Sequence, residues 1–360
     1  MHYGILTLED YRQEAHGSIA SLYGNIVGRA VEAERLGYHG FWLTEHHFHW
    51  HGGVHSAPLV LLSGVAQATE RIRLGIAVVE MPFWDPLKIA EEYACLDQLS
   101  NGRVEFGAGR GFLKAEYDGW GISMSESRAR FQENLEVLER AWSEERLSFQ
   151  GQFHSYDQVL VVPQPAQRPH PPIWIAATIT PESYTWIGQH GYPLMVVPYV
   201  QPSVDHLKEN IGRYLDAYRA AGHSAEPRVY AFFMAAIGDD TDRLRDEIGP
   251  YMKNYGGSST TANAAAGGER PKDQYGAFDV VGGVNRMGRD FDGMRERHSV
   301  LIGTPQYCIE ELRYLQQQWS LTYTAIIPSF GGVPEARVRD TMRRFACEII
   351  PAMENSPARA

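Results

Sequence analysis

The chain has 360 residues, enough for two ordinary domains or for one large α/β barrel with a sizeable core. Its formal net charge of −11 argues against nucleic acid or an anionic membrane surface as a partner. Its three cysteines lie far apart and its N-terminus lacks the basic region of a signal peptide, so we expect a cytoplasmic protein without disulfides.

The first half of the chain alternates runs typical of strands with runs typical of helices. Apolar residues at helical spacing mark the helices, and short apolar runs mark the strands. Strands are predicted at 3–8, 40–43, 71–79 and 103–108, and helices at 26–36, 58–68, 86–99 and 127–145. This order predicts an α/β protein.

Residues 96–111 contain the most informative stretch, in which a helix passes through a turn into a strand. Asn101 and Gly102 are expected to supply the left-handed backbone that ends the helix. Alternate glycines then remove side chains from the strand exit, namely Gly107, Gly109 and Gly111. Arg110 stands among them and could hold a phosphate with two hydrogen bonds. Phe112 occupies the third glycine position of a dinucleotide fingerprint, which argues against a Rossmann site.

The second half of the chain continues the alternation after a hairpin predicted at 148–153. Strands are predicted at 172–177, 193–198, 228–237 and 323–328, and helices from 181 and at 204–221, 240–255, 304–319 and 334–351. Residues 256–291 are rich in glycine, serine and alanine and predict a mobile surface insertion. Eight strands alternating with helices predict a single (β/α)₈ TIM barrel domain with insertions over residues 1–360.

The site of such a barrel lies at the C-terminal ends of its strands. The predicted strand ends carry Glu45, His46 and His47, then Ala77 and Val78, then Gly109, Arg110 and Phe112, and then Thr178 and Ile179. Ser183 follows at a helix start, and a hydroxyl at a helix N-terminus near an arginine favours a phosphate site. A histidine in such a pocket can move protons near neutral pH.

Five histidines lie close together in the sequence: His46, His47, His49, His51 and His55. Alternate histidines can bind zinc, so a metal site is one alternative. No aspartate or cysteine ligand lies nearby in the sequence, and we expect no metal. A purely structural role is a further alternative for His49, His51 and His55, which lie past the strand end.

Together these residues resemble the bacterial luciferase-like family of flavin-dependent monooxygenases. The resemblance spans nearly the whole chain and is strongest at 42–48, 96–111 and 301–308. It implies a (β/α)₈ barrel that usually dimerises and binds reduced FMN supplied by a separate reductase. Dioxygen would add to the flavin, and the resulting peroxide would insert an oxygen atom into a small organic substrate.

The resemblance also implies roles for individual residues. Arg110 matches the phosphate-binding arginine, with Ser183 and the backbone at Thr178 and Ile179 completing that site. Thr180 is the alternative to Ser183, because the spacing differs by about one residue from the family pattern. Two further departures are the replacement of a carboxylate–serine pair by Thr178 and Ile179, and of a reactive cysteine by Gly109, from which we expect a wider site.

Around the flavin ring the resemblance implies a non-proline cis peptide between Ala77 and Val78, with Glu45 beside the flavin. His46 matches the catalytic histidine, and Glu116 falls where luciferases have an aspartate. Aromatic residues near the expected mouth favour an apolar substrate: Phe48, Trp50, Phe83, Trp84, Phe112 and Trp120.

We therefore expect an FMN-dependent monooxygenase, and a homodimer. The alternatives are a deazaflavin-dependent oxidoreductase that transfers hydride, and a catalytically silent flavin-binding paralogue. Retention of Glu45, His46 and Arg110 favours the monooxygenase.

Overall fold

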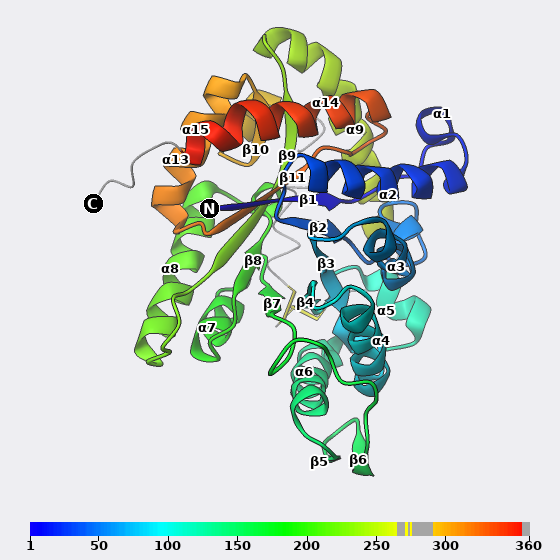
Figure 1. Cartoon of the computed structure of the whole chain (residues 1–360). Helices are drawn as coiled ribbons and strands as arrows, with labels where there is room; N and C mark the ends of the chain where they lie inside the picture. The colour runs from blue at the N-terminus through cyan, green and yellow to red at the C-terminus, as the bar shows by residue number, and fades with distance from the viewer. Residues whose placement is uncertain (265–270, 273, 276–290, 355–360) are drawn as a thin grey trace.

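The computed structural model describes residues 1–264, 271–272, 274–275 and 291–354. Eight parallel strands form a closed barrel (Figure 1). They are β1 (His2–Thr7), β2 (Gly40–Leu43), β3 (Arg73–Glu80), β4 (Val104–Gly109), β7 (Ile173–Ala176), β8 (Leu194–Val196), β9 (Val229–Ile237) and β11 (Tyr323–Ile327). Neighbours pair in chain order, and the β11–β1 ladder, with Tyr3 opposite Thr324, closes the ring. The predicted (β/α)₈ barrel is confirmed.

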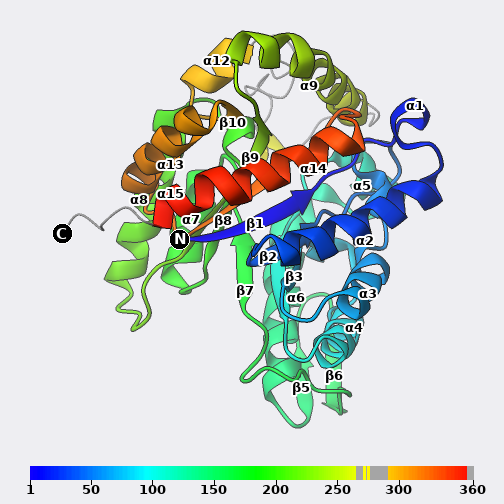
Figure 2. The ribbon, with the colours of Figure 1, turned by 45° about the horizontal axis from the view of Figure 1, so that its top comes forward.

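Helices surround the barrel (Figures 1 and 2). The longer ones are α2 (Ile19–Arg35), α3 (Pro58–Ala68), α4 (Pro86–Leu99), α6 (Ser127–Ser143), α7 (Pro181–Gln189), α8 (Val204–Ala220), α9 (Thr241–Ala264), α13 (Pro305–Trp319) and α14 (Glu335–Arg344). The shorter ones are α1 (Gln13–His16), α5 (Lys114–Trp120), α12 (Phe291–Glu296), α15 (Ile350–Glu354) and the single turns Gly53–His55, Met81–Phe83, Met124–Glu126, Pro198–Val200 and Phe345–Ile349. In the described part of the chain, no helix combines the length and apolarity needed to cross a membrane.

Aromatic side chains fill the barrel interior beneath the site. The Trp42 ring contacts Tyr230 edge-on, with ring centroids 5.5 Å apart, and Trp174 lies 5.4 Å from the same tyrosine ring. The indole N–H of Trp174 donates to the buried carboxylate of Glu105 at 2.9 Å. A Cβ at Gly75 would lie 2.2 Å from the Trp42 ring, so only glycine leaves room for this packing.

The glycine-rich stretch after α4 takes the expected form. Asn101 and Gly102 have φ values of 56° and 77°, which confirms the left-handed helix stop. The strand β4 follows directly and delivers Arg110 to the C-terminal end of the barrel. A hairpin of β5 (Leu147–Gln150) and β6 (Ser155–Val159) confirms the predicted one and projects beside α6 (Figures 1 and 2).

Four elements differ from the prediction. Helix α2 begins at Ile19 rather than at 26, because Ser18 caps it by accepting from the Ser21 N–H at 3.1 Å. Helix α5 and strand β10 (Val300–Gly303), which pairs with the end of β9, were not predicted. Helix α9 continues to Ala264, so residues 256–264 are helical and do not begin an insertion. Most of the remaining predicted insertion, to 291, lies outside the described residues.

Candidate active site

A cavity opens at the C-terminal ends of the barrel strands, as the fold requires. It brings together almost all of the residues predicted for the site: Glu45, His46, Ala77, Val78, Gly109, Arg110, Phe112, Thr178 and Ser183. Thr180, the alternative to Ser183, also lines it. The exception is Ile179, whose carbonyl oxygen accepts from His206 of α8 at 3.1 Å and whose side chain is buried away from the cavity.

One side of the cavity has the features of an anion site. Arg110 lines it next to Thr180 and Ser183 at the start of α7, where no side chain caps the helix. The Arg110 guanidinium donates to Gln274 Oε1 at 3.2 Å and lies 5.1 Å from the centre of the Tyr275 ring. A guanidinium beside uncapped N–H groups at a helix N-terminus is suited to a phosphate.

The floor between β3 and β4 is formed by Val78 and Gly109. The peptide bond between Ala77 and Val78 is cis, as the family resemblance implied. A Cβ placed on Gly109 would lie 2.3 Å from Val78 Cγ2, so the valine side chain already fills the space beside the glycine. The expectation that Gly109 widens the site is therefore wrong, because Val78 takes the volume that a larger residue would occupy.

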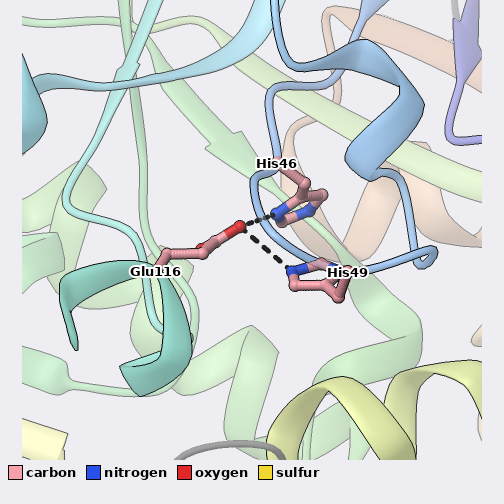
Figure 3. Close-up of side chains that lie close together, drawn as sticks. All are labelled: His46, His49 and Glu116. Carbon is pink, nitrogen blue, oxygen red and sulfur yellow. Dashed lines mark hydrogen bonds and ion pairs between the residues drawn. The ribbon is translucent and has the colours of Figure 1, made fainter. Parts of the chain in front are cut away.

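His46 lies in a hydrogen-bonded network with Glu116 of α5 (Figure 3). Glu116 Oε1 lies 3.0 Å from His46 Nδ1 and 3.2 Å from His49 Nε2, and it accepts from the His47 backbone N–H at 2.9 Å. Burial opposes ionisation of Glu116, but these three contacts outweigh it and hold its pKa well below the ordinary value. Glu116 is therefore a carboxylate that fixes the orientation of the His46 ring.

Glu80, at the end of β3, is a second buried acid in the wall of the cavity. Burial, together with the neighbouring Glu116 and Glu45, raises the pKa of Glu80 well above its ordinary value. The Oε2 atoms of Glu80 and Glu116 are both buried, and among the described residues no N–H or hydroxyl group donates to either of them. A protonated Glu80 that donates to Glu116 satisfies both groups, so we expect Glu80 to be neutral at pH 7.

The donor atoms of His46, His49 and Glu116 lie within 4.8 Å of one another. The sequence showed no acidic ligand near the histidines, which follow β2. The fold brings Glu116 beside them from α5, which follows β4. Because both histidine nitrogens already lie at hydrogen-bond distance from one carboxylate oxygen, we interpret the cluster as a hydrogen-bonded network. The expected absence of a metal stays a prediction.

The other histidines of the loop have separate partners. His47 contacts Glu45 at 3.3 Å, and His55 is fully buried 3.2 Å from the Thr44 hydroxyl, which fits a structural role. His51 lines the cavity and pairs with Asp10.

Only Phe112 of the six aromatic residues predicted at the mouth lines the cavity. Phe83 packs against Tyr117, the Trp84 indole donates to Glu45, and Phe48 contacts Trp120. The apolar lining comes instead from residues that were not singled out: Leu6, Leu8, Met195, Val197 and Phe232. Tyr199 and Tyr255 were also missed. Tyr199 directly follows the strand predicted at 193–198, a signal that could have found it, whereas nothing in the sequence links Tyr255 to the strand ends.

Residues 1–321 match the family model described as luciferase-like monooxygenase. The oxygenase component of the flavin-dependent trigonelline monooxygenase of Acinetobacter baylyi is 25% identical over 343 residues, which cover 93% of this chain and 91% of that one. For two other curated relatives the match covers less than two thirds of the relative's own length, 64% of one and 51% of the other.

Two solved structures share the fold over nearly the whole chain. The crystal structure of monooxygenase RslO1 from Streptomyces bottropensis is 30% identical, covers 98% of this chain and 99% of that one, and superposes with a TM-score of 0.83. An F420-dependent secondary alcohol dehydrogenase is 16% identical, covers 98% of each chain, and has a TM-score of 0.71. The chain therefore belongs to the luciferase-like monooxygenase family, and it is an enzyme of that family.

Proposed function

We propose that this enzyme uses reduced FMN and dioxygen to oxidise a small, largely apolar organic substrate. The observation that carries the proposal is one cavity that holds Arg110 beside the uncapped start of α7 and also holds His46 paired with Glu116. The first group is suited to the phosphate of a mononucleotide, and the second to proton transfer.

The residues present fit a flavin mononucleotide. Arg110, with Thr180 or Ser183 and the first N–H groups of α7, would hold the phosphate, and Glu45, Val78 and Gly109 would lie along the ring. When bound, reduced FMN supplies the electrons that activate dioxygen, of which one atom enters the substrate and the other leaves as water.

The protein's own contribution centres on His46. Its Nδ1 faces Glu116, and no donor or acceptor among the described residues lies within hydrogen-bond distance of its Nε2. Glu116 therefore fixes the ring, and Nε2 is left to exchange a proton with substrate or to donate to a developing negative charge. The apolar walls exclude water from this step.

The supply of reduced flavin is assigned to a separate reductase. The name of the Acinetobacter baylyi relative, an oxygenase component, supports a two-component system. Cytoplasmic location and a homodimer complete the proposal.

The leading alternative is hydride transfer with a deazaflavin, because F420-dependent enzymes are among the solved structures that share the fold. A catalytically silent flavin-binding paralogue is the second alternative. The placement of His46 in the cavity, hydrogen-bonded to a buried carboxylate, argues against a silent protein.

A titration of the purified protein with FMN, oxidised and photoreduced, followed by admission of air, tests the proposal. We expect tighter binding of the reduced form and a transient change in flavin absorbance after air. Arg110→Ala should weaken FMN binding by about 10- to 100-fold through loss of a charged contact, while the surface control Arg146→Ala should not. Binding of a deazaflavin but not of FMN would support the first alternative.

His46→Ala separates binding from chemistry in the same protein. We expect FMN affinity within about threefold of the wild type and turnover reduced by about 100-fold or more, the range typical of a lost proton-transfer group. Unchanged turnover with any accepted substrate would remove His46 from the mechanism.

A further inference from the structure

A second histidine–carboxylate pair faces the same cavity. His51 Nδ1 lies 2.9 Å from Asp10 Oδ1, and the two residues are 4% and 2% exposed. The backbone holds the pair in place, since Asp10 and His51 form an antiparallel bridge and the Gly52 N–H donates to the Glu9 carbonyl at 2.9 Å. His51 lines the cavity, and Asp10 lies behind it.

This contact determines which nitrogen of His51 carries the proton. An ionised carboxylate only accepts hydrogen bonds, so a neutral His51 must carry its proton on Nδ1. Nε2 is then an acceptor, and within the described ranges no protein donor lies within hydrogen-bond distance of it. With a neutral His51 the cavity therefore presents a fixed acceptor that a ligand must satisfy.

Two tyrosines add a donor to the same wall. The Tyr255 ring lies 4.8 Å from the His51 ring, and the Tyr255 and Tyr199 hydroxyl oxygens lie 3.1 Å apart. A single hydrogen bond between two hydroxyls uses one of their two hydrogens and leaves the other to donate. Leu6 and Leu8, which shortly precede Asp10 in the chain, add apolar surface to the cavity, and Ser259 also lines it.

We propose that the substrate is a hydroxyl-bearing molecule, such as a phenol or an alcohol, whose O–H donates to Nε2 of His51. This inference rests on the proposed function, because it names the substrate class of the same site. The tyrosine pair donates to the oxygen of that hydroxyl, and the apolar walls contact the carbon skeleton. A site built to bond a hydroxyl discriminates against the analogue that lacks it, because a buried polar group is then left unpaired.

Calorimetric titration with 2-naphthol and with its methyl ether, 2-methoxynaphthalene, tests the proposal in the full-length protein. The titrations are made without flavin and again with saturating FMN, so that binding in the flavin's place is recognised by competition. We expect the wild type to bind the phenol about 10-fold more tightly than the ether. His51→Phe should bring the two affinities to within about twofold, whereas the exposed control His190→Phe should keep the wild-type ratio.

Asp10→Asn provides a test that does not remove the ring. The amide N–H would donate to Nδ1 and move the His51 proton to Nε2, which turns the acceptor into a donor. The preference for the phenol should then disappear or reverse toward the ether, and a thermal unfolding curve checks that each variant is folded.

Equal wild-type affinity for the two probes, binding of neither, or a preference that survives both substitutions would overturn the assignment of His51. The cofactor is judged separately by FMN titration. A protein that discriminates the probes but binds no FMN would refute the proposed cofactor alone, and FMN binding without discrimination would refute the hydroxyl site alone.

Discussion

Gly109→Ala tests the close packing of the Val78 side chain against the backbone of Gly109 in this cavity. The added Cβ would lie 2.3 Å from Val78 Cγ2 and 3.2 Å from Val78 Cβ, so the whole valine must move rather than only its tip. Valine is stiff about χ1, and overpacking of this kind typically costs about 1–3 kcal/mol. An unfolding entropy of about 0.8 kcal/mol/K for a chain of this length converts that cost to a fall in Tm of about 1–4 °C.

Urea denaturation of a double-mutant cycle measures the effect. In a Val78→Ala background, Gly109→Ala should cost less than about 0.5 kcal/mol, because the clashing methyl groups are absent. Gly24→Ala is the matched control: its Cβ meets nothing within 4 Å inside α2, so helix propensity should leave stability equal or raise it by about 0.5–1 kcal/mol. A Gly109→Ala protein as stable as the wild type, or a cost that Val78→Ala leaves unchanged, would refute the reasoning.

Two further predictions concern buried titratable groups. Glu80→Leu removes the donor to Glu116 and should lower the free energy of unfolding at pH 7 by about 1–3 kcal/mol, whereas Glu80→Gln, whose amide can still donate, should cost less than about 1 kcal/mol. Equal losses in urea denaturation would contradict a protonated Glu80. Burial lowers the pKa of His55 from 6.5 to about 4, so between these pH values the unfolded chain binds a proton that the folded protein does not. As the pH falls through that window the wild type should lose up to about 3 kcal/mol of stability that His55→Gln does not lose; parallel pH profiles for the two proteins would show that His55 is not responsible.

Periodicity and turn residues were sufficient to predict the barrel, because its buried strands and amphipathic helices are marked locally. Helix α4 and strand β2 have the predicted bounds, since Pro86 begins the helix, Asn101 and Gly102 end it, and glycine begins the strand. The end of α9 was missed because Gly256 and its neighbours have a loop composition. There the helix continues with Thr260 donating to the Gly256 carbonyl at 2.7 Å, a local contact that composition does not indicate.

The candidate site was predictable to the extent that it lies on strand ends. Parallel strands in chain order place Glu45, Val78 and Arg110 at one end of the barrel without any knowledge of side-chain packing. Ile179 does not line the cavity, because it lies three residues beyond the end of β7, in a loop whose course the sequence does not specify. The close packing of Val78 against Gly109 depends on the distance between β3 and β4, and the sequence does not specify that distance.

The histidine loop shows most directly why spacing alone could not assign roles. His46, His51 and His55 lie in one ten-residue stretch after β2 and have the same side chain, so the sequence left catalytic, metal-binding and structural roles open. Their surroundings differ: the Glu116 carboxylate lies at hydrogen-bond distance from His46 and the Asp10 carboxylate from His51. The fully buried His55 instead contacts the Thr44 hydroxyl and is affected by the Glu9 carboxylate only through its charge. A hydrogen bond from one ring nitrogen to a buried carboxylate fixes the ring and leaves its other nitrogen for a ligand. A hydrogen bond to a hydroxyl brings no negative charge that would stabilise a protonated ring. Hydrogen bonds to carboxylates therefore distinguish His46 and His51, which line the cavity that also holds Arg110, from His55, which does not line it.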